Sequence, residues 1–68
     1  MTFGQKLKMT RKRKGFSSQE SLGLALGVST HAVRMYECDE YRPRFVVINK
    51  MCRVFNMTYD ELMEGVEI

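Results

Sequence analysis

The sequence predicts a small all-α fold of five short helices, in which the second and third helices form a helix-turn-helix. The chain has 68 residues, 44% of them hydrophobic, which suits a single domain with one core over residues 1–68 and excludes a disordered segment. Turn and helix-ending residues divide the chain into five pieces, at Gly15, Gly27, residues 38–43 and Asn56. None of the pieces shows the alternation of apolar and polar residues that is typical of a strand.

The first helix is expected from about Thr2 to Lys14. Phe3, Leu7 and Thr10 share one face of it at helical spacing, and basic residues occupy much of the remainder. Gly15 suits the left-handed conformation that commonly ends a helix.

The second helix is expected over Gln19–Leu26. Ser18 is a good N-cap for it, because a serine hydroxyl accepts a hydrogen bond from a free N–H of the first turn. Leu22 and Leu26 form its buried pair, and Gly27 breaks the helix.

The third helix is expected over Thr30–Glu37, with Ser29 as its N-cap and an apolar face made by Val33 and Tyr36. A polar loop follows, in which Pro43 favours an extended chain.

The fourth and fifth helices complete the predicted fold. The fourth covers Phe45–Phe55, ends at Asn56, and has an apolar face predicted to contain Phe45, Ile48, Cys52 and Phe55. A capping box, in which the Thr58 and Glu61 side chains bond each other's backbone N–H, starts a fifth helix ending near Met63. The side chains expected to pack on the fourth helix are those of Tyr59, Leu62 and Met63.

Charge is distributed unevenly along the chain, although the formal net charge is only +3. Residues 1–14 contain six basic residues and no acid, whereas the tail from Asp60 onward contains four acids and no basic residue. This asymmetry predicts one positive side, to which a polyanion could bind, and one negative side. On charge alone, a solvated helix face explains the basic segment as well as nucleic-acid binding does.

The cysteine pattern and the hydropathy point to a cytoplasmic protein. Cys38 and Cys52 form neither a disulfide framework nor a zinc-binding spacing, so free thiols in a reducing compartment are expected. No apolar run is long enough to span a bilayer, and no signal peptide is visible. No cofactor, no small-molecule ligand and no membrane partner are expected.

Residues 19–38 have the arrangement of a helix-turn-helix, in which a short turn crosses two helices steeply and leaves the second protruding. Gly23 is expected where the two helices approach most closely, and Gly27 permits a turn with positive φ. The apolar seam between the helices consists of Leu22, Leu26, Val28, Val33 and Tyr36. This seam leaves a set of side chains pointing outward from the third helix, namely Thr30, His31, Arg34 and Met35.

Five sequence segments, in order and at characteristic spacing, resemble the Cro and lambda-type repressor family, also called the xenobiotic response element family of bacterial and phage regulators. They are Ser18-Gln19-Glu20, Leu26-Gly27-Val28-Ser29, Val33 followed by Glu37, Arg42-Pro43-Arg44-Phe45, and Thr58-Tyr59-Asp60-Glu61-Leu62. The resemblance covers about residues 3–63. It implies a lambda-repressor-like five-helix domain that binds specific double-stranded DNA and regulates transcription, as a repressor and as a homodimer on DNA.

The resemblance also implies roles for individual residues. Reading of base edges in the major groove is implied for Thr30, His31, Arg34 and Met35, with a phosphate as an alternative target for Arg34. Contact with DNA phosphates is implied for Gln19, Ser29, Arg42 and Arg44. A salt bridge between Arg11 and Glu37 is implied as an architectural link between the first and third helices, since a buried charge is costly without its partner.

The chain departs from the family pattern at several places. The first loop, Phe16-Ser17-Ser18, has one residue more than usual, and Thr10 stands where leucine is common. Cys38-Asp39 replaces the common Asn-Gly, which puts a negative charge near the expected phosphates. Leu24 and Ala25 replace polar residues on the outer face of the second helix.

Two other classes of function are alternatives to DNA binding. A protein-interaction module, such as an antitoxin-like or regulatory partner, is the alternative, and it is favoured by Leu24, Ala25 and the acidic tail. No enzyme is expected, because nothing resembles a nucleophile–base pair or a phosphate-cradling glycine loop. His31, the single histidine, has no Cys, Asp or Glu three or four positions away to complete a metal site.

Overall fold

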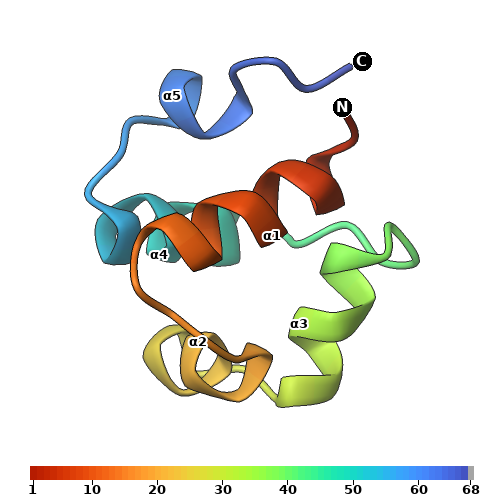
Figure 1. The fold of residues 1–68 in the computed structure, drawn as a ribbon, viewed down its shortest axis with the longest axis vertical. Coiled ribbons are helices and arrows are strands. Elements are labelled where there is room, and N and C mark those ends of the chain that lie inside the picture. Colours follow the sequence, from red (N-terminus) through yellow and green to blue (C-terminus); the bar gives the residue numbers. More distant parts are fainter. Residues whose placement is uncertain (68) are drawn as a thin grey trace.

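Five α-helices succeed one another in the structure, a computed structural model that describes residues 1–67 (Figure 1). They are α1 (Phe3–Arg13), α2 (Gln19–Leu26), α3 (Thr30–Glu37), α4 (Phe45–Phe55) and α5 (Tyr59–Met63). No strand occurs within the described range. The prediction of an all-α fold with a helix-turn-helix at the second and third helices is confirmed.

The helix ends lie where the predicted caps are. Hydroxyl groups of Ser18, Ser29 and Thr58 each accept a hydrogen bond from a backbone N–H of the first turn of α2, α3 and α5. Gly27 and Asn56, with φ of 73° and 55°, end α2 and α4 in the left-handed conformation. Local caps therefore define the starts of α2, α3 and α5 and the ends of α2 and α4, whereas Arg44 at the start of α4 makes no side-chain capping bond.

The Glu61 carboxyl completes the capping box at the start of α5. It accepts a hydrogen bond of 2.9 Å from the backbone N–H of Thr58. This backbone bond, together with one from the Thr58 side chain, lowers the pKa of the Glu61 carboxyl. The carboxylate form that caps the helix is thereby favoured.

One core holds the helices together. Its fully buried apolar residues come from all five helices and are Leu7, Leu22, Leu26, Val33, Met51, Phe55 and Leu62. Phe16, in the loop between α1 and α2, adds an edge-to-face contact with Phe55, with ring centroids 6.0 Å apart. The first loop therefore contributes an aromatic ring to the core.

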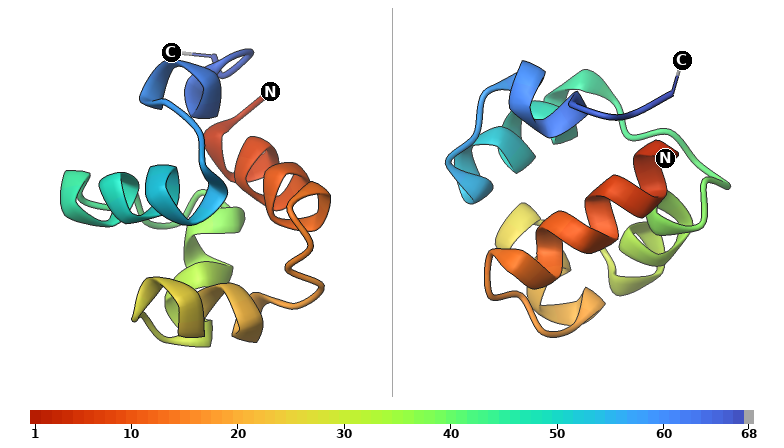
Figure 2. Two further views of the ribbon diagram at one scale, coloured as in Figure 1. Left: turned by 90° about the vertical axis from the view of Figure 1, so that its left-hand side faces the viewer. Right: turned by 45° about the horizontal axis from the view of Figure 1, so that its top comes forward.

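Two predicted core contacts are wrong. Phe45 is 74% exposed and Tyr59 is 55% exposed, although both were expected on buried faces. Phe45 begins α4, and the first turn of that helix projects beyond the other helices (Figure 2, left), so no element covers it. The buried face of α4 instead centres on Met51 and Phe55, and burial raises the pKa of the half-buried Cys52 thiol beside them.

The two ends of the described chain lie side by side (Figure 2, right). The backbone N–H of Glu67 donates to the carbonyl of Met1 at 2.8 Å, and the Glu67 carboxylate is 3.0 Å from the amino group of Met1. Lys6 is buried on α1 and donates from Nζ to the Glu64 carbonyl at 2.8 Å. These bonds hold the acidic tail against α1, at the end of the molecule opposite α2 (Figure 1).

Thr10 is fully buried on α1, and its Oγ1 has no hydrogen-bond partner among residues 1–67. An unsatisfied buried hydroxyl costs free energy, and valine has nearly the same shape without the polar atom. We therefore expect Thr10→Val to raise the free energy of unfolding by about 1 kcal/mol, measured by urea denaturation. Thr10→Ser keeps the hydroxyl and removes the methyl group, so it should lower stability; a destabilising valine would contradict the assignment.

None of the helices within residues 1–67 is long and apolar enough to cross a bilayer.

Candidate nucleic-acid interface

The helix-turn-helix lies at the end of the molecule remote from α5 (Figure 1). Gly27, Val28 and Ser29 connect α2 to α3, and the N–H of Val28 donates to the Gly23 carbonyl at 3.0 Å. A Cβ atom added at Gly23 would lie 2.9 Å from the Val28 carbonyl oxygen. Glycine at this position therefore allows the turn to pack directly on α2, which braces the start of α3.

α3 has one buried face and one free face. Val33 and Glu37 are buried, whereas Thr30, His31 and Arg34 are exposed. Met35, also predicted to point outward, is half-buried. The free face thus presents a hydroxyl and an imidazole in the first turn of α3 and a guanidinium one turn later. Each of these groups can hydrogen-bond to a base edge.

Ser29 lies at the N-terminus of α3, which is the positive end of the helix dipole. Ser29 is exposed, and its hydroxyl caps α3 by accepting a hydrogen bond of 3.0 Å from the N–H of Ala32. The remaining first-turn N–H groups of a helix have no intrahelical partner and favour an anion. Ser29 therefore lies where a phosphate contact is sterically accessible, although its hydroxyl already serves as the cap.

A buried polar cluster joins α1, α2 and α3. Arg11 Nε is 2.7 Å from Glu37 Oε2, and both side chains are almost completely buried. Arg11 also donates to the Phe16 carbonyl at 2.9 Å. Gln19 Nε2 donates to the second carboxylate oxygen, Glu37 Oε1, at 3.0 Å. One carboxylate on α3 thereby fixes α1, the first loop and the first residue of α2.

Gln19 was predicted to contact a phosphate, and the structure shows that its amide nitrogen is directed to Glu37 instead of to solvent. The residue is half-buried, and it is the first residue of α2 after the Ser18 cap. The backbone N–H of Gln19 lies in the first turn of α2, where the helix dipole favours an anion. The sequence did not reveal the bond to Glu37, because the two residues lie 18 positions apart.

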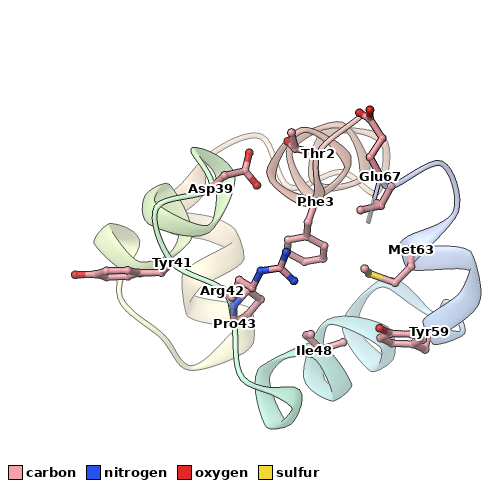
Figure 3. A pocket seen from close by; sticks show the side chains of 11 residues that line it. Thr2, Phe3, Asp39, Tyr41, Arg42, Pro43, Ile48, Tyr59, Met63 and Glu67 are labelled. Carbon is pink, nitrogen blue, oxygen red and sulfur yellow. The ribbon is translucent and has the colours of Figure 1, made fainter.

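The loop between α3 and α4 contains Arg42 and Arg44, the two arginines predicted to contact DNA phosphates. Arg44 is exposed at the N-cap of α4, and its side chain makes no capping hydrogen bond. Arg42 is also exposed, and it lines a groove beside Phe3 (Figure 3). Both guanidinium groups are accessible to solvent, and the two arginines lie on either side of the buried Pro43.

Asp39 has a structural partner that the sequence did not indicate. Its backbone adopts a left-handed φ of 62°, and its Oδ1 accepts a hydrogen bond of 2.9 Å from the N–H of Gly4. The carboxylate therefore bonds the first turn of α1, where an anion is stabilised by the helix dipole. The Asp39 carboxylate, which was expected to repel nearby phosphates, thus joins the start of α1 to the residues that follow α3.

The described residues contain no group of three His, Cys, Asp or Glu side chains that could hold a metal ion. His31 accordingly stands on the free face of α3 without ligand partners among residues 1–67.

Comparison with known proteins gives consistent matches over nearly the whole chain. The family described as the Cro/C1-type HTH DNA-binding domain matches residues 6–67. An uncharacterized HTH-type transcriptional regulator of Bacillus subtilis strain 168, YgzD, is 35% identical over 57 residues, which are 84% of this chain and 85% of YgzD.

Two solved structures of the P22 c2 repressor are similar in fold. A crystal structure of that repressor in complex with a synthetic operator has a TM-score of 0.83 at 25% identity and covers 96% of this chain and 97% of the repressor chain. A solution structure of its DNA-binding domain has a TM-score of 0.84 at 25% identity, with 96% and 84% coverage.

Proposed function

This chain belongs to the Cro/C1-type helix-turn-helix family of DNA-binding domains, and from that membership we propose that it binds a specific duplex sequence and acts as a transcriptional repressor. The observation that carries the proposal is the free face of α3, on which Thr30, His31 and Arg34 are exposed while Val33 is buried against the core. The names of YgzD, a transcriptional regulator, and of the operator-bound P22 c2 repressor support it. The proposed unit is one domain over residues 1–68.

In this mechanism α3 enters the major groove. The exposed side chains of Thr30, His31 and Arg34 read base edges, and the half-buried Met35 contacts a thymine methyl group at the edge of that surface. Contacts to phosphates fix the position of the domain on the duplex, and we assign them to Gln19, Ser29, Arg42 and Arg44. The acidic α5 and tail lie at the opposite end of the molecule, so they do not repel the DNA at close range (Figure 1).

We also propose that the protein binds DNA as a homodimer. One recognition helix reads only a few base pairs, and two copies on half-sites separated by about one helical turn (~34–36 Å) would double the sequence read. Exposed apolar side chains on the first turn of α4, Phe45 at 74% and Val46 at 52%, are available for such a contact. Sedimentation of the protein–operator complex measures the stoichiometry.

Salt should weaken DNA binding strongly, because each cation on a phosphate releases a condensed counterion. Two cationic contacts per domain, Arg42 and Arg44, predict about a tenfold loss of affinity per domain between 50 and 200 mM salt. Fluorescence anisotropy with a labelled duplex, over that range of salt, measures the slope. An affinity that does not change with salt would exclude the proposed phosphate contacts.

Variants at the two kinds of contact should behave differently on a panel of duplexes. His31→Ala removes a base reader, so it should change the order of preference among sequences, by up to about tenfold at the affected base pair. Arg44→Ala removes a phosphate contact and should weaken all sequences by a similar factor. Selection from a random duplex pool measures both. A uniform loss for His31→Ala would contradict its role as a reader.

The second candidate function is that of a protein-interaction module. Exposed apolar side chains on the outer face of α2 favour it. Leu24 is 78% exposed, and the adjacent Ala25 is exposed as well. The salt titration separates the two candidates, because a pure interaction module would not bind random duplex even at low salt.

A further inference from the structure

A groove of about 540 Å³ opens on the side of the molecule between the start of α1, the loop from α3 to α4, α4 and α5 (Figure 3). Its volume is within the range of about 300–1,000 Å³ that is usual for small-molecule sites. None of the residues that line it belongs to α2 or α3. The groove is therefore a feature separate from the helix-turn-helix.

The walls of the groove are mainly apolar. Phe3 of α1, Ile48 of α4 and Met63 of α5 line it, and all three side chains are half-buried. In Figure 3 these three side chains point into one hollow from three different helices. Apolar surface that converges on a concave space gains free energy when a ligand removes it from water.

Arg42 lines the groove without an ion-pair partner among the described residues. Arg42 points into the hollow toward Phe3 (Figure 3), and no carboxylate among residues 1–67 lies within salt-bridge distance of it. The two carboxylates that line the groove are already bonded. Asp39 accepts the N–H of Gly4 at 2.9 Å, and Glu67 is 3.0 Å from the amino group of Met1.

We propose that this groove binds an amphipathic organic carboxylate. The carboxylate pairs with the guanidinium of Arg42, which can donate two parallel hydrogen bonds to it. The apolar body of the ligand lies against Phe3, Ile48 and Met63. A cationic or purely apolar ligand fits less well, because it would leave Arg42 unpaired beside it. Arg42 is also one of the proposed phosphate contacts, so the ligand and DNA would share this guanidinium, but binding of the carboxylate itself requires no DNA.

Two probe carboxylates, octanoate and 4-phenylbutyrate, test the proposal by titration into ¹⁵N-labelled protein, followed by amide chemical shifts. We expect at least one of them to shift amides confined to the groove, saturating with a Kd near or below about 1 mM. Octylammonium has the same chain as octanoate with the opposite charge, and it should bind at least about tenfold more weakly.

Arg42→Gln should weaken the binding of the carboxylate by about tenfold or more. Arg53→Gln is the matched control, because Arg53 is an exposed arginine of α4 outside this groove and its loss should leave Kd unchanged. Both positions are exposed, so both variants should keep the spectrum of the folded protein.

Three results would overturn the proposal. The first is the absence of groove shifts with both carboxylates, and the second is equal binding of octylammonium. The third is the appearance of the same shifts when the protein alone is concentrated, since a second copy of the chain would then cover the groove. The titration contains no DNA, so a failure of DNA recognition would leave its outcome unaffected.

Discussion

Arg11→Met is expected to lower the free energy of unfolding by about 3–5 kcal/mol, because it leaves a buried carboxylate without its cation. Glu37 is one of the most buried charged residues in the fold, and its Oε2 lies 2.7 Å from Arg11 Nε. After the substitution only the hydrogen bond from Gln19, at 3.0 Å, remains on that carboxylate. The carbonyl of Phe16 also loses its donor. A domain of this size is only marginally stable, so the loss is comparable with its whole stability.

Urea denaturation followed by circular dichroism measures this effect, and two further variants identify its cause. Arg11→Met combined with Glu37→Leu removes both charges, so it should regain most of the stability lost by the single variant. Glu37→Gln keeps an acceptor for Gln19 but leaves the buried Arg11 without its anion, so it should also lower the free energy of unfolding. If Arg11→Met cost less than about 1 kcal/mol, the pair would behave as a solvent-exposed ion pair and the buried link between α1 and α3 would be wrong.

The limits of the helices were predictable because they depend on neighbours in sequence. Ser18 and Ser29 bond N–H groups three residues ahead, and Gly27 changes the backbone direction on its own. The exposure of Thr30, His31 and Arg34 followed for the same reason. Once the helix and its buried Val33 are fixed, the periodicity of 3.6 residues determines which side chains face away.

The errors arose where a distant segment decides the environment of a residue. Periodicity shows which residues share a face of α4, but it does not show whether another helix is long enough to cover Phe45 at the end of that face. The bonds from Lys6 to Glu64 and from Gly4 to Asp39 span 58 and 35 positions. No local pattern indicates them, because they depend on how α1 is docked.

Gly4 is the clearest case of a residue whose role the sequence did not reveal. It is buried in the first turn of α1, where glycine is a weak helix former and the usual expectation is that alanine would serve better by about 1 kcal/mol. A Cβ atom added there would overlap the backbone carbonyl oxygen of Glu37 and lie 2.8 Å from the carbonyl oxygen of Tyr36. These are backbone atoms of α3, so they cannot rotate aside as a flexible side chain would.

Gly4→Ala is therefore expected to lower the free energy of unfolding by about 3 kcal/mol, against its favourable helix propensity. Relief of the overlap requires α1 to move away from α3, and that movement also stretches the bond from the Gly4 N–H to Asp39 and the pair between Arg11 and Glu37. Urea denaturation measures the loss, with Lys8→Ala on the exposed face of α1 as the control that should change stability by no more than about 0.5 kcal/mol. A Gly4→Ala protein as stable as the parent would show that α1 and α3 do not approach at this position, and the buried link between them would lose its geometric basis.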